Sequence, residues 1–269
     1  MKILCPAKIN LFLNVVGLKG NMHDLVLLNQ TVNLYDEIEL TVTKVSTITI
    51  VSDDDIPLDE TNSIYKAAKL FLSTMSISDG ISFHVKKRIP VEAGLGGEST
   101  DAAGTLLLLN AYYHLNLSID ELCKMGIQIG SDVPFFLHSG FCQVTSIGDE
   151  ISKPSILNPY QYYVVVKPNF GLSTKDMFQR IDSLPFERVG MENLPWNDFM
   201  KVVPESILSI QKGFLDLGLS HHTLSGSGSS YYVALKEKDD VLFQQIKSLY
   251  PEYQVFLLEN CDGFDIKNI

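Results

Sequence analysis

The sequence contains few cysteines, and none of them lie close together. The four are Cys5, Cys123, Cys142 and Cys261, and they form no Cys-x-x-Cys pair. A zinc knuckle or a dithiol redox motif needs such close spacing, so the sequence indicates neither. The pattern favours scattered thiols, as is typical of the reducing cytosol.

Long apolar stretches are also absent. No run of about 18 uninterrupted apolar residues occurs, so no membrane-spanning helix is predicted. Polar or proline residues, namely Lys2, Pro6, Lys8 and Asn10, interrupt the first apolar positions. The N-terminus therefore lacks the apolar core of a secretory signal. We expect a cytoplasmic protein that does not bind a membrane.

Basic side chains are outnumbered by acidic ones. Lys and Arg total 21, Asp and Glu total 32, and the formal net charge is −11. A protein that binds a polyanion needs a positive surface, so we expect no nucleic-acid partner. One small phosphorylated ligand stays compatible with this charge, because it needs only a few local donors. No feature of the sequence indicates an oligomeric state.

The rest of the composition is that of a globular protein. The chain has 269 residues, of which 45% are hydrophobic. This length suits one large or two medium domains with a sizeable core. Strand-like and helix-like segments are interspersed, which predicts an α+β fold. We place a domain boundary in the proline-containing stretch 151–159, which divides the chain into residues 1–152 and 153–269.

The spacing of apolar residues predicts the individual elements. Strands are expected at 2–17, at several places within 25–51, and at 80–88, 162–167, 231–235 and 253–258. Helices are expected at 62–74, 102–115, 173–181, 207–217 and 240–249, and one more after a capping box at 118–121. Residues 17–24 and 182–204 are expected to be loops or irregular.

A glycine-rich stretch at residues 90–103 precedes one of these helices. Its glycines and hydroxyl residues are Gly94, Gly96, Gly97, Ser99 and Thr100. Either Ser99 or Thr100 suits a helix N-cap. A glycine-rich loop at a helix N-terminus is a ready site for an anion such as phosphate. The stretch is neither a Walker A loop nor a dinucleotide fingerprint, so a simple turn and cap explain it equally well when it is taken alone.

Three polar residues each allow two interpretations. Lys8 interrupts an alternating strand, as either a surface side chain or a catalytic cation carried by the strand. His23 lies in a predicted loop, where an ordinary surface histidine is favoured. Asp132 stands before Val-Pro, where a structural N-cap is favoured if no other motif adds to it.

Three stretches, taken together and in order, resemble the GHMP kinase superfamily. They are Pro6–Leu13, the loop 94–103 and Leu224–Ser230. That superfamily shares an N-terminal strand motif, a central phosphate loop and a C-terminal glycine-rich loop. Pro6–Leu13 and Gly130–Phe136 are further similar to the members that phosphorylate a CDP-linked methylerythritol in non-mevalonate isoprenoid precursor biosynthesis.

The resemblance implies a two-lobed α+β fold with the active site between the lobes. The N-terminal ATP-binding lobe would carry a left-handed βαβ crossover, an exception to the usual handedness. The C-terminal lobe would hold an antiparallel sheet with helices. The implied activity is phosphorylation of a substrate hydroxyl, with ATP as donor and Mg²⁺ as the metal.

The resemblance also implies roles for single residues. Lys8 and Asp132 match the catalytic pair. The implied ATP-binding residues are Pro90, Gly94, Leu95, Gly96, Gly97, Ser99 and Thr100, and the last two are also candidates for the metal. The implied substrate-binding residues are Asn10, His23, Thr174, Phe178, Ser225 and Gly226.

The residue types suit this chemistry on their own account. A carboxylate such as Asp132 can accept the proton of a hydroxyl nucleophile. Lys8 can keep that carboxylate ionised and stabilise charge on the transferred group. An aromatic face such as Phe178 can stack on a cytosine.

Three residues depart from the pattern of the superfamily. Met22 stands where a base-stacking tyrosine is common, Glu98 where glycine or serine is usual, and Asp101 where asparagine is usual. A carboxylate near the phosphates of ATP would repel them. We therefore expect Glu98 to point out of the loop.

Two other functions remain open. One is another kinase of the superfamily, with a homoserine-like or mevalonate-like substrate. The other is a non-catalytic ligand sensor on the same fold. His23 and Phe178 favour the cytidine substrate, and the presence of both Lys8 and Asp132 argues against a sensor.

Overall fold

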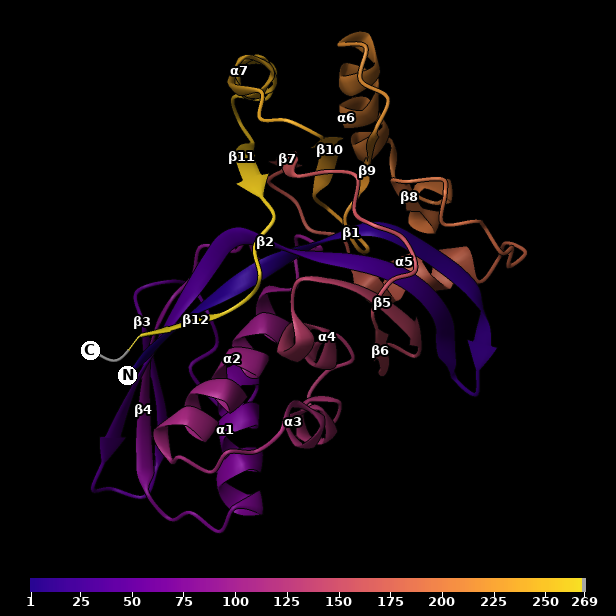
Figure 1. Cartoon of the computed structure of the whole chain (residues 1–269). Helices are drawn as coiled ribbons and strands as arrows, with labels where there is room; N and C mark the ends of the chain where they lie inside the picture. The colour runs from indigo at the N-terminus through magenta and orange to yellow at the C-terminus, as the bar shows by residue number, and fades with distance from the viewer. Residues whose placement is uncertain (268–269) are drawn as a thin grey trace.

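The computed structural model describes residues 1–267, which form two β-sheets with helices around them (Figure 1). The larger sheet is built on a long antiparallel pair, β1 (Lys2–Lys19) and β2 (Met22–Thr43). Its order is β12-β1-β2-β4-β3, and β5, β6 and β8 join it off this path. These further strands are β3 (Ile48–Ser52), β4 (Gly80–Lys86), β5 (Phe141–Ser146), β6 (Glu150–Ser152), β8 (Trp196–Asn197) and β12 (Asp265–Lys267).

Four helices lie on one side of this sheet, below it in Figure 1. They are α1 (Ser63–Thr74), α2 (Gly97–Tyr112), α3 (Ile119–Gly126) and α4 (Val133–His138), and α3 packs on the other three. The parallel strands β3 and β4 are joined through α1, which is the βαβ unit that the resemblance implies. The handedness of this crossover stays a prediction.

The smaller sheet has the order β11-β7-β10-β9, and all its neighbours are antiparallel. Its strands are β7 (Tyr162–Lys167), β9 (His222–Leu224), β10 (Tyr231–Leu235) and β11 (Gln254–Glu259). The accompanying helices are α5 (Thr174–Ile181), the 3-10 helix η1 (Asp198–Lys201), α6 (Glu205–Asp216) and α7 (Asp240–Leu249). The expected two-lobed α+β fold, with an antiparallel sheet in the C-terminal part, is confirmed.

Alternation along the strands divides the apolar residues between two cores, because successive side chains of a strand point to opposite faces. Ile9 of β1 belongs to the same buried cluster as Tyr163 of β7 and Tyr232 of β10, so this cluster joins the two sheets. The neighbouring Val164 belongs instead to the cluster that includes Phe214 of α6.

The C-terminal part of the chain returns to the larger sheet twice. Strand β8 pairs in parallel with Phe12 and Leu13 of β1, and β12 pairs antiparallel with residues 2–4 near the start of β1. Both parts of the chain therefore contribute strands to the larger sheet, as well as side chains to one core. The division into residues 1–152 and 153–269 stays a prediction.

Most of the expected elements are confirmed, but the expected loop at 17–24 is wrong. Strand β1 continues to Lys19 and β2 already begins at Met22. Only Gly20 and Asn21 turn the chain, and Gly20 has a φ of +64°, which glycine adopts without strain. Likewise, the several strands expected within 25–51 are the long β2 and the short β3.

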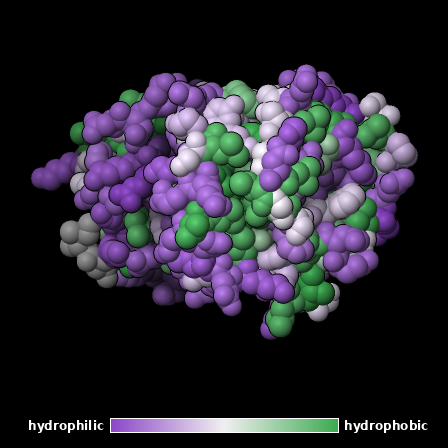
Figure 2. Space-filling view, turned by 90° about the horizontal axis from the view of Figure 1, so that it is seen from above, coloured by the Kyte–Doolittle hydropathy of each residue, from purple (hydrophilic) through white to green (hydrophobic). Residues whose placement is uncertain are grey.

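The surface in Figure 2 is a mosaic of polar residues with hydrophobic residues between them. Singly exposed apolar side chains are normal on a globular protein. Over residues 1–267, no helix has the length and apolar character needed to span a membrane.

Candidate active site

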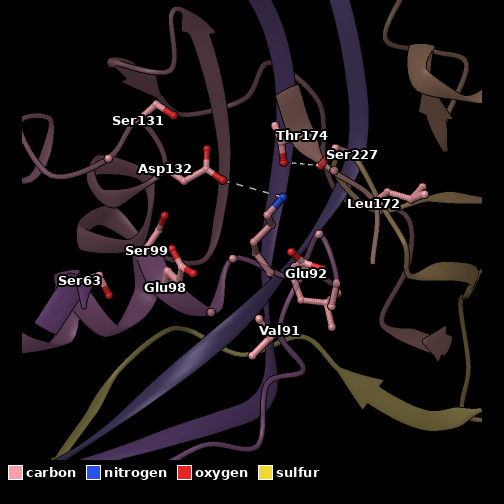
Figure 3. A pocket seen from close by; sticks show the side chains of 18 of the residues that line it. Ser63, Val91, Glu92, Glu98, Ser99, Ser131, Asp132, Leu172, Thr174 and Ser227 are labelled. Carbon is pink, nitrogen blue, oxygen red and sulfur yellow. Dashed lines mark hydrogen bonds and ion pairs between the residues drawn. The ribbon is translucent and has the colours of Figure 1, made fainter. Parts of the chain in front are cut away.

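A cavity of about 970 Å³ is lined by residues from both parts of the chain. Its walls come from β1, the glycine-rich stretch and the start of α4 on one side, and from α5 and the loop 226–228 on the other. Figure 3 shows Asp132, Ser99 and Glu98 on one wall, with Thr174 and Ser227 opposite. This volume lies within the range of small-molecule sites.

The glycine-rich stretch forms a loop that enters α2 earlier than expected. The N-cap is Gly96, with a left-handed φ of +78°, and the helix begins at Gly97. The prediction of Ser99 or Thr100 as N-cap is therefore wrong, since glycine takes this conformation more easily than either. The first N–H groups of a helix lack partners within it, so this helix start can bind an anion at the cavity.

Gly96 lies where the loop, β1 and α4 meet. A Cβ at this position would approach the Phe136 ring to 2.6 Å and Lys8 Cγ to 3.1 Å. The backbone N–H of Lys8 also donates a hydrogen bond of 2.9 Å to the Leu95 carbonyl. The loop is thus fixed against the strand that carries Lys8.

The two glycine-rich loops of the chain pack against each other. A Cβ on Gly94 would lie 2.0 Å from the Ser225 carbonyl oxygen. Ser225 Oγ donates to the Gly94 carbonyl at 3.0 Å, and the Ser230 N–H donates to the Ala93 carbonyl at 3.1 Å. Ser225 is fully buried in this contact and does not line the cavity, whereas Gly226 does.

Lys8 is buried at the cavity floor with only 4% of its surface exposed, so its interpretation as a surface side chain is wrong. Its Nζ donates to Asn10 Oδ1, and Asn10 Nδ2 donates to Asn29 Oδ1 at 2.6 Å. Burial lowers the pKa of the Lys8 ammonium, and the Asp132 carboxylate acts in the opposite direction. Asn10 therefore orients the Lys8 ammonium, in addition to the substrate role that the resemblance implies for it.

Asp132 stands at the N-cap position of α4, but its side chain makes no capping hydrogen bond. Its Oδ2 lies 4.0 Å from Lys8 Nζ, and its side chain is one third exposed, at 33%. The dashed line that starts at Asp132 in Figure 3 marks this ion pair. The interpretation of Asp132 as a structural cap is therefore wrong, because its carboxylate faces the cavity.

The other end of the cavity carries aromatic and hydroxyl side chains. The His23 ring stacks on Phe178 with 4.1 Å between centroids, and Thr174 Oγ1 lies 2.8 Å from Ser227 Oγ. All four line the cavity. Strand β2 thus brings His23 to α5, although the sequence placed it in a loop.

A sequence profile described as "GHMP kinases N terminal domain" matches residues 62–140. A 4-diphosphocytidyl-2-C-methyl-D-erythritol kinase of Clostridium tetani is 35% identical, over 95% of this chain and 99% of the relative. The relative of the same name from Clostridium novyi is 37% identical, over 81% of this chain and 78% of its own.

The chain belongs to the GHMP kinase superfamily, in the family of these relatives. The crystal structure of a 4-(cytidine 5'-diphospho)-2C-methyl-D-erythritol kinase matches this kinase with a TM-score of 0.81 at 26% identity, covering 98% of this chain and all of the other. A homoserine kinase from Cytophaga hutchinsonii matches with a TM-score of 0.75 at 20% identity, covering 98% and 96%, and shows the shared fold. Membership makes the chain an ATP-dependent small-molecule kinase.

The resemblance assigns Ser99 and Thr100 to ATP and the metal, but only one of them lines the cavity. Ser99 lines the cavity. Thr100 is fully buried in α2 and is not among the cavity residues. The expected outward orientation of Glu98 is also wrong, since it lines the cavity from the first turn of α2 beside Ser99 (Figure 3).

The kinase holds a buried charge cluster beside its glycine-rich loop, which was not predicted from the sequence. Lys87 Nζ forms ion pairs with Asp101 Oδ2, at 2.6 Å, and with Asp36 Oδ2. Asp36 Oδ1 accepts the Arg88 and Ile89 N–H groups at 2.6 and 2.9 Å. The basic run before Pro90 was a signal for a cation here, but nothing in the sequence pairs it with Asp36.

Two further cavity residues were also missed. Asp182 Oδ1 is hydrogen-bonded to His23 Nε2 at 2.7 Å, although the two residues are 159 positions apart in the sequence. No local pattern reveals a contact of that span. Ser227 lies in the glycine-serine loop that the sequence had singled out, so its place in that loop was a usable signal.

Proposed function

We propose that this kinase phosphorylates a hydroxyl of 4-diphosphocytidyl-2-C-methyl-D-erythritol with ATP, as a step of non-mevalonate isoprenoid precursor biosynthesis. The observation that carries the proposal is the placing of Lys8 and Asp132 between two distinct ends of one cavity. One end is a helix N-terminus suited to phosphate, and the other is an aromatic surface suited to a base. The names of the relatives, at 35–37% identity, support the substrate.

The chemistry follows from the two charged groups at the centre. The substrate hydroxyl oxygen forms a bond to the γ-phosphorus of ATP, and the bond from that phosphorus to the ADP oxygen breaks. The proton of the hydroxyl passes to the Asp132 carboxylate. Lys8 is fixed by Asn10 and stabilises the negative charge on the transferred group.

The glycine loop supplies the nucleotide contacts in this proposal. Backbone groups of Gly94, Leu95, Gly96 and Gly97, with Pro90 and the Ser99 hydroxyl, would line the phosphates and adjacent nucleotide. Thr100 would act from behind, by packing the first turn of α2. Substrate contacts would come from His23, Phe178, Thr174 and Gly226, while Asn10 and Ser225 position the groups around them.

The oxygen donors in the first turn of α2 fit Mg²⁺, which prefers oxygen ligands and commonly keeps phosphates and waters as partners. Ser99 and Glu98 would hold it, and when bound it would neutralise charge on the phosphates. This resolves the repulsion expected between Glu98 and ATP. Glu98→Gln should then raise the Mg²⁺ concentration needed for half-maximal turnover, and an unchanged requirement would remove Glu98 from the metal site.

A substrate panel tests the proposed function. With ATP and Mg²⁺, phosphate transfer should be detected on the CDP-linked methylerythritol, and homoserine, mevalonate and galactose should show no comparable turnover. Efficient transfer to one of these three, with none to the cytidine compound, would replace the proposal with another kinase of the superfamily. Binding of the cytidine compound without any ADP release would favour a ligand sensor.

A further inference from the structure

We propose that Asp182 is a positioning residue that fixes the tautomer of His23, so that the kinase distinguishes a cytosine from a uracil. This inference rests on the proposed function, because it concerns how the base of that substrate is read. Asp182 follows the last residue of α5, and His23 lies at the start of β2. The contact therefore ties the β1–β2 hairpin to the helix that carries Phe178.

The position of the His23 ring is set from two directions. Its face lies on Phe178 with an interplanar angle of 22°, and Phe178 in turn packs edge-on against Phe199 with 4.9 Å between centroids. Its edge is held by Asp182 Oδ1, 2.7 Å from Nε2. His23, Phe178, Phe199 and Asp182 all line the cavity, so a fixed imidazole is presented to a ligand.

The partner of one ring nitrogen determines the chemistry of the other. A carboxylate accepts hydrogen bonds and donates none when ionised, so Asp182 holds the proton of a neutral imidazole on Nε2. Nδ1 then carries a lone pair and acts as an acceptor. Within residues 1–267, Nδ1 of His23 has no hydrogen-bond partner of its own.

An acceptor at this place selects between the two pyrimidines. Cytosine carries an amino group at position 4, which donates, whereas uracil carries a carbonyl oxygen there, which only accepts. The Nδ1 lone pair therefore attracts the first and repels the second. A site that leaves a polar group unpaired against the wrong ligand discriminates more strongly than one that only differs in shape.

The test compares Asp182→Asn with the unchanged kinase by calorimetric titration with CDP and with UDP. The amide has no charge to hold the proton at Nε2 and can present an N–H to that nitrogen, which moves the ring proton to Nδ1. We expect the preference for CDP over UDP to fall about tenfold. Nitrogen-15 NMR of the imidazole should show the proton on Nε2 in the unchanged kinase and a shift toward Nδ1 in the variant.

Asp176→Asn is the matched control, since it removes the same charge from an exposed position outside the cavity, in the first turn of the helix that Asp182 follows. It should change neither the CDP preference nor the NMR spectrum. An unchanged preference in Asp182→Asn, or a ring proton that stays on Nε2, would overturn the inference while leaving the proposed function intact. Failure of the unchanged kinase to bind CDP in preference to UDP would overturn the inference too, and turnover in the substrate panel then shows whether the proposed function falls with it.

Discussion

At the scale of single residues, a substitution of Asp132 distinguishes a structural role of this side chain from a catalytic one. Its carboxylate makes no capping bond and lies 4.0 Å from Lys8 Nζ. Asp132→Asn keeps the shape but removes the base. We expect turnover to fall by about 10²–10⁴-fold, the usual effect of losing a general base. Binding of ATP and of the cytidine substrate should persist.

The same sample should also show almost no loss of thermal stability. An N-cap role would instead predict a cost of roughly 1 kcal/mol or less, with turnover near normal. Melting temperature and turnover are therefore measured together. Near-normal turnover, with a melting temperature that is unchanged or slightly lower, would return Asp132 to a structural role.

Asp101 carries a buried carboxyl group that is only partly compensated by its neighbours. It is fully buried, and its Oδ1 has no hydrogen-bond partner within residues 1–267. Burial raises the pKa of Asp101 to about 7, against the attraction of Lys87 and with the added repulsion of Asp36. Burial alone would lower the pKa of Lys87, but the two carboxylates raise it above its ordinary value.

The raised pKa of Asp101 fixes the sign of a pH effect. Below pH 4 the carboxyl is protonated in both the folded and the unfolded chain. Between pH 4 and about pH 7 the unfolded chain ionises while the folded chain keeps the proton. The folded state then binds more protons, so its stability falls as the pH rises through this window.

Asp101→Asn should remove this fall in stability. Measured as the free energy of unfolding in urea, the variant should gain on the unchanged kinase by on the order of 2–4 kcal/mol between pH 4 and pH 8. Asp53→Asn, at an exposed turn, is the control and should show no such gain. A pH-independent difference between Asp101→Asn and the unchanged kinase would mean that Asp101 is ionised throughout.

At the scale of elements, the conformation of the glycine-rich loop before α2 depends on one glycine. Gly96 combines a φ of +78° with contacts to Phe136 and Lys8 that leave no room for a Cβ. Gly96→Ala should cost about 2–4 kcal/mol of stability, from backbone strain plus overpacking. The displaced loop and Lys8 should also raise the Michaelis constant for ATP and lower turnover.

Gly218→Ala separates the cost of backbone strain from the cost of overpacking. Gly218 has a similar φ of +74°, but a Cβ there would meet nothing within 4 Å. It should cost only about 1–2 kcal/mol, the strain alone, and leave the ATP constant unchanged. Equal effects of the two substitutions on stability and on ATP would show that the packing around Gly96 is unimportant.

Elements were predictable from the sequence where the signal is local. Apolar spacing located α1 and the other long helices, and the capping box of Ser118 and Glu121 marked the start of α3. The β1–β2 hairpin was missed because its turn holds only two residues inside a longer polar stretch. Long-range contacts, such as His23 with Asp182, leave no trace in a single sequence, since they exist only once the sheets are assembled.

At the scale of the whole molecule, the two parts of the chain are held together because both contribute strands to the larger sheet and side chains to one core. Strand β1 receives β8 and β12 from the C-terminal part. Its residues Ile9, Leu11 and Phe12 are fully buried in the cluster that also includes side chains of β7 and β10. The cavity has the same dual origin, so the site exists only when both parts are in place.

This arrangement predicts that residues 1–152 do not fold alone. The fragment would expose the apolar face of β1 that Tyr163 and Tyr232 cover, and each buried aromatic or aliphatic side chain contributes about 1.5–3 kcal/mol. A net stability of roughly 5–15 kcal/mol cannot absorb several such losses. Circular dichroism should show one cooperative thermal transition for the full chain and none for the fragment, while co-expression with residues 153–269 should restore it. A cooperative transition of the fragment alone would show that the N-terminal part is an independent domain, and that the core between the sheets adds to a fold already complete.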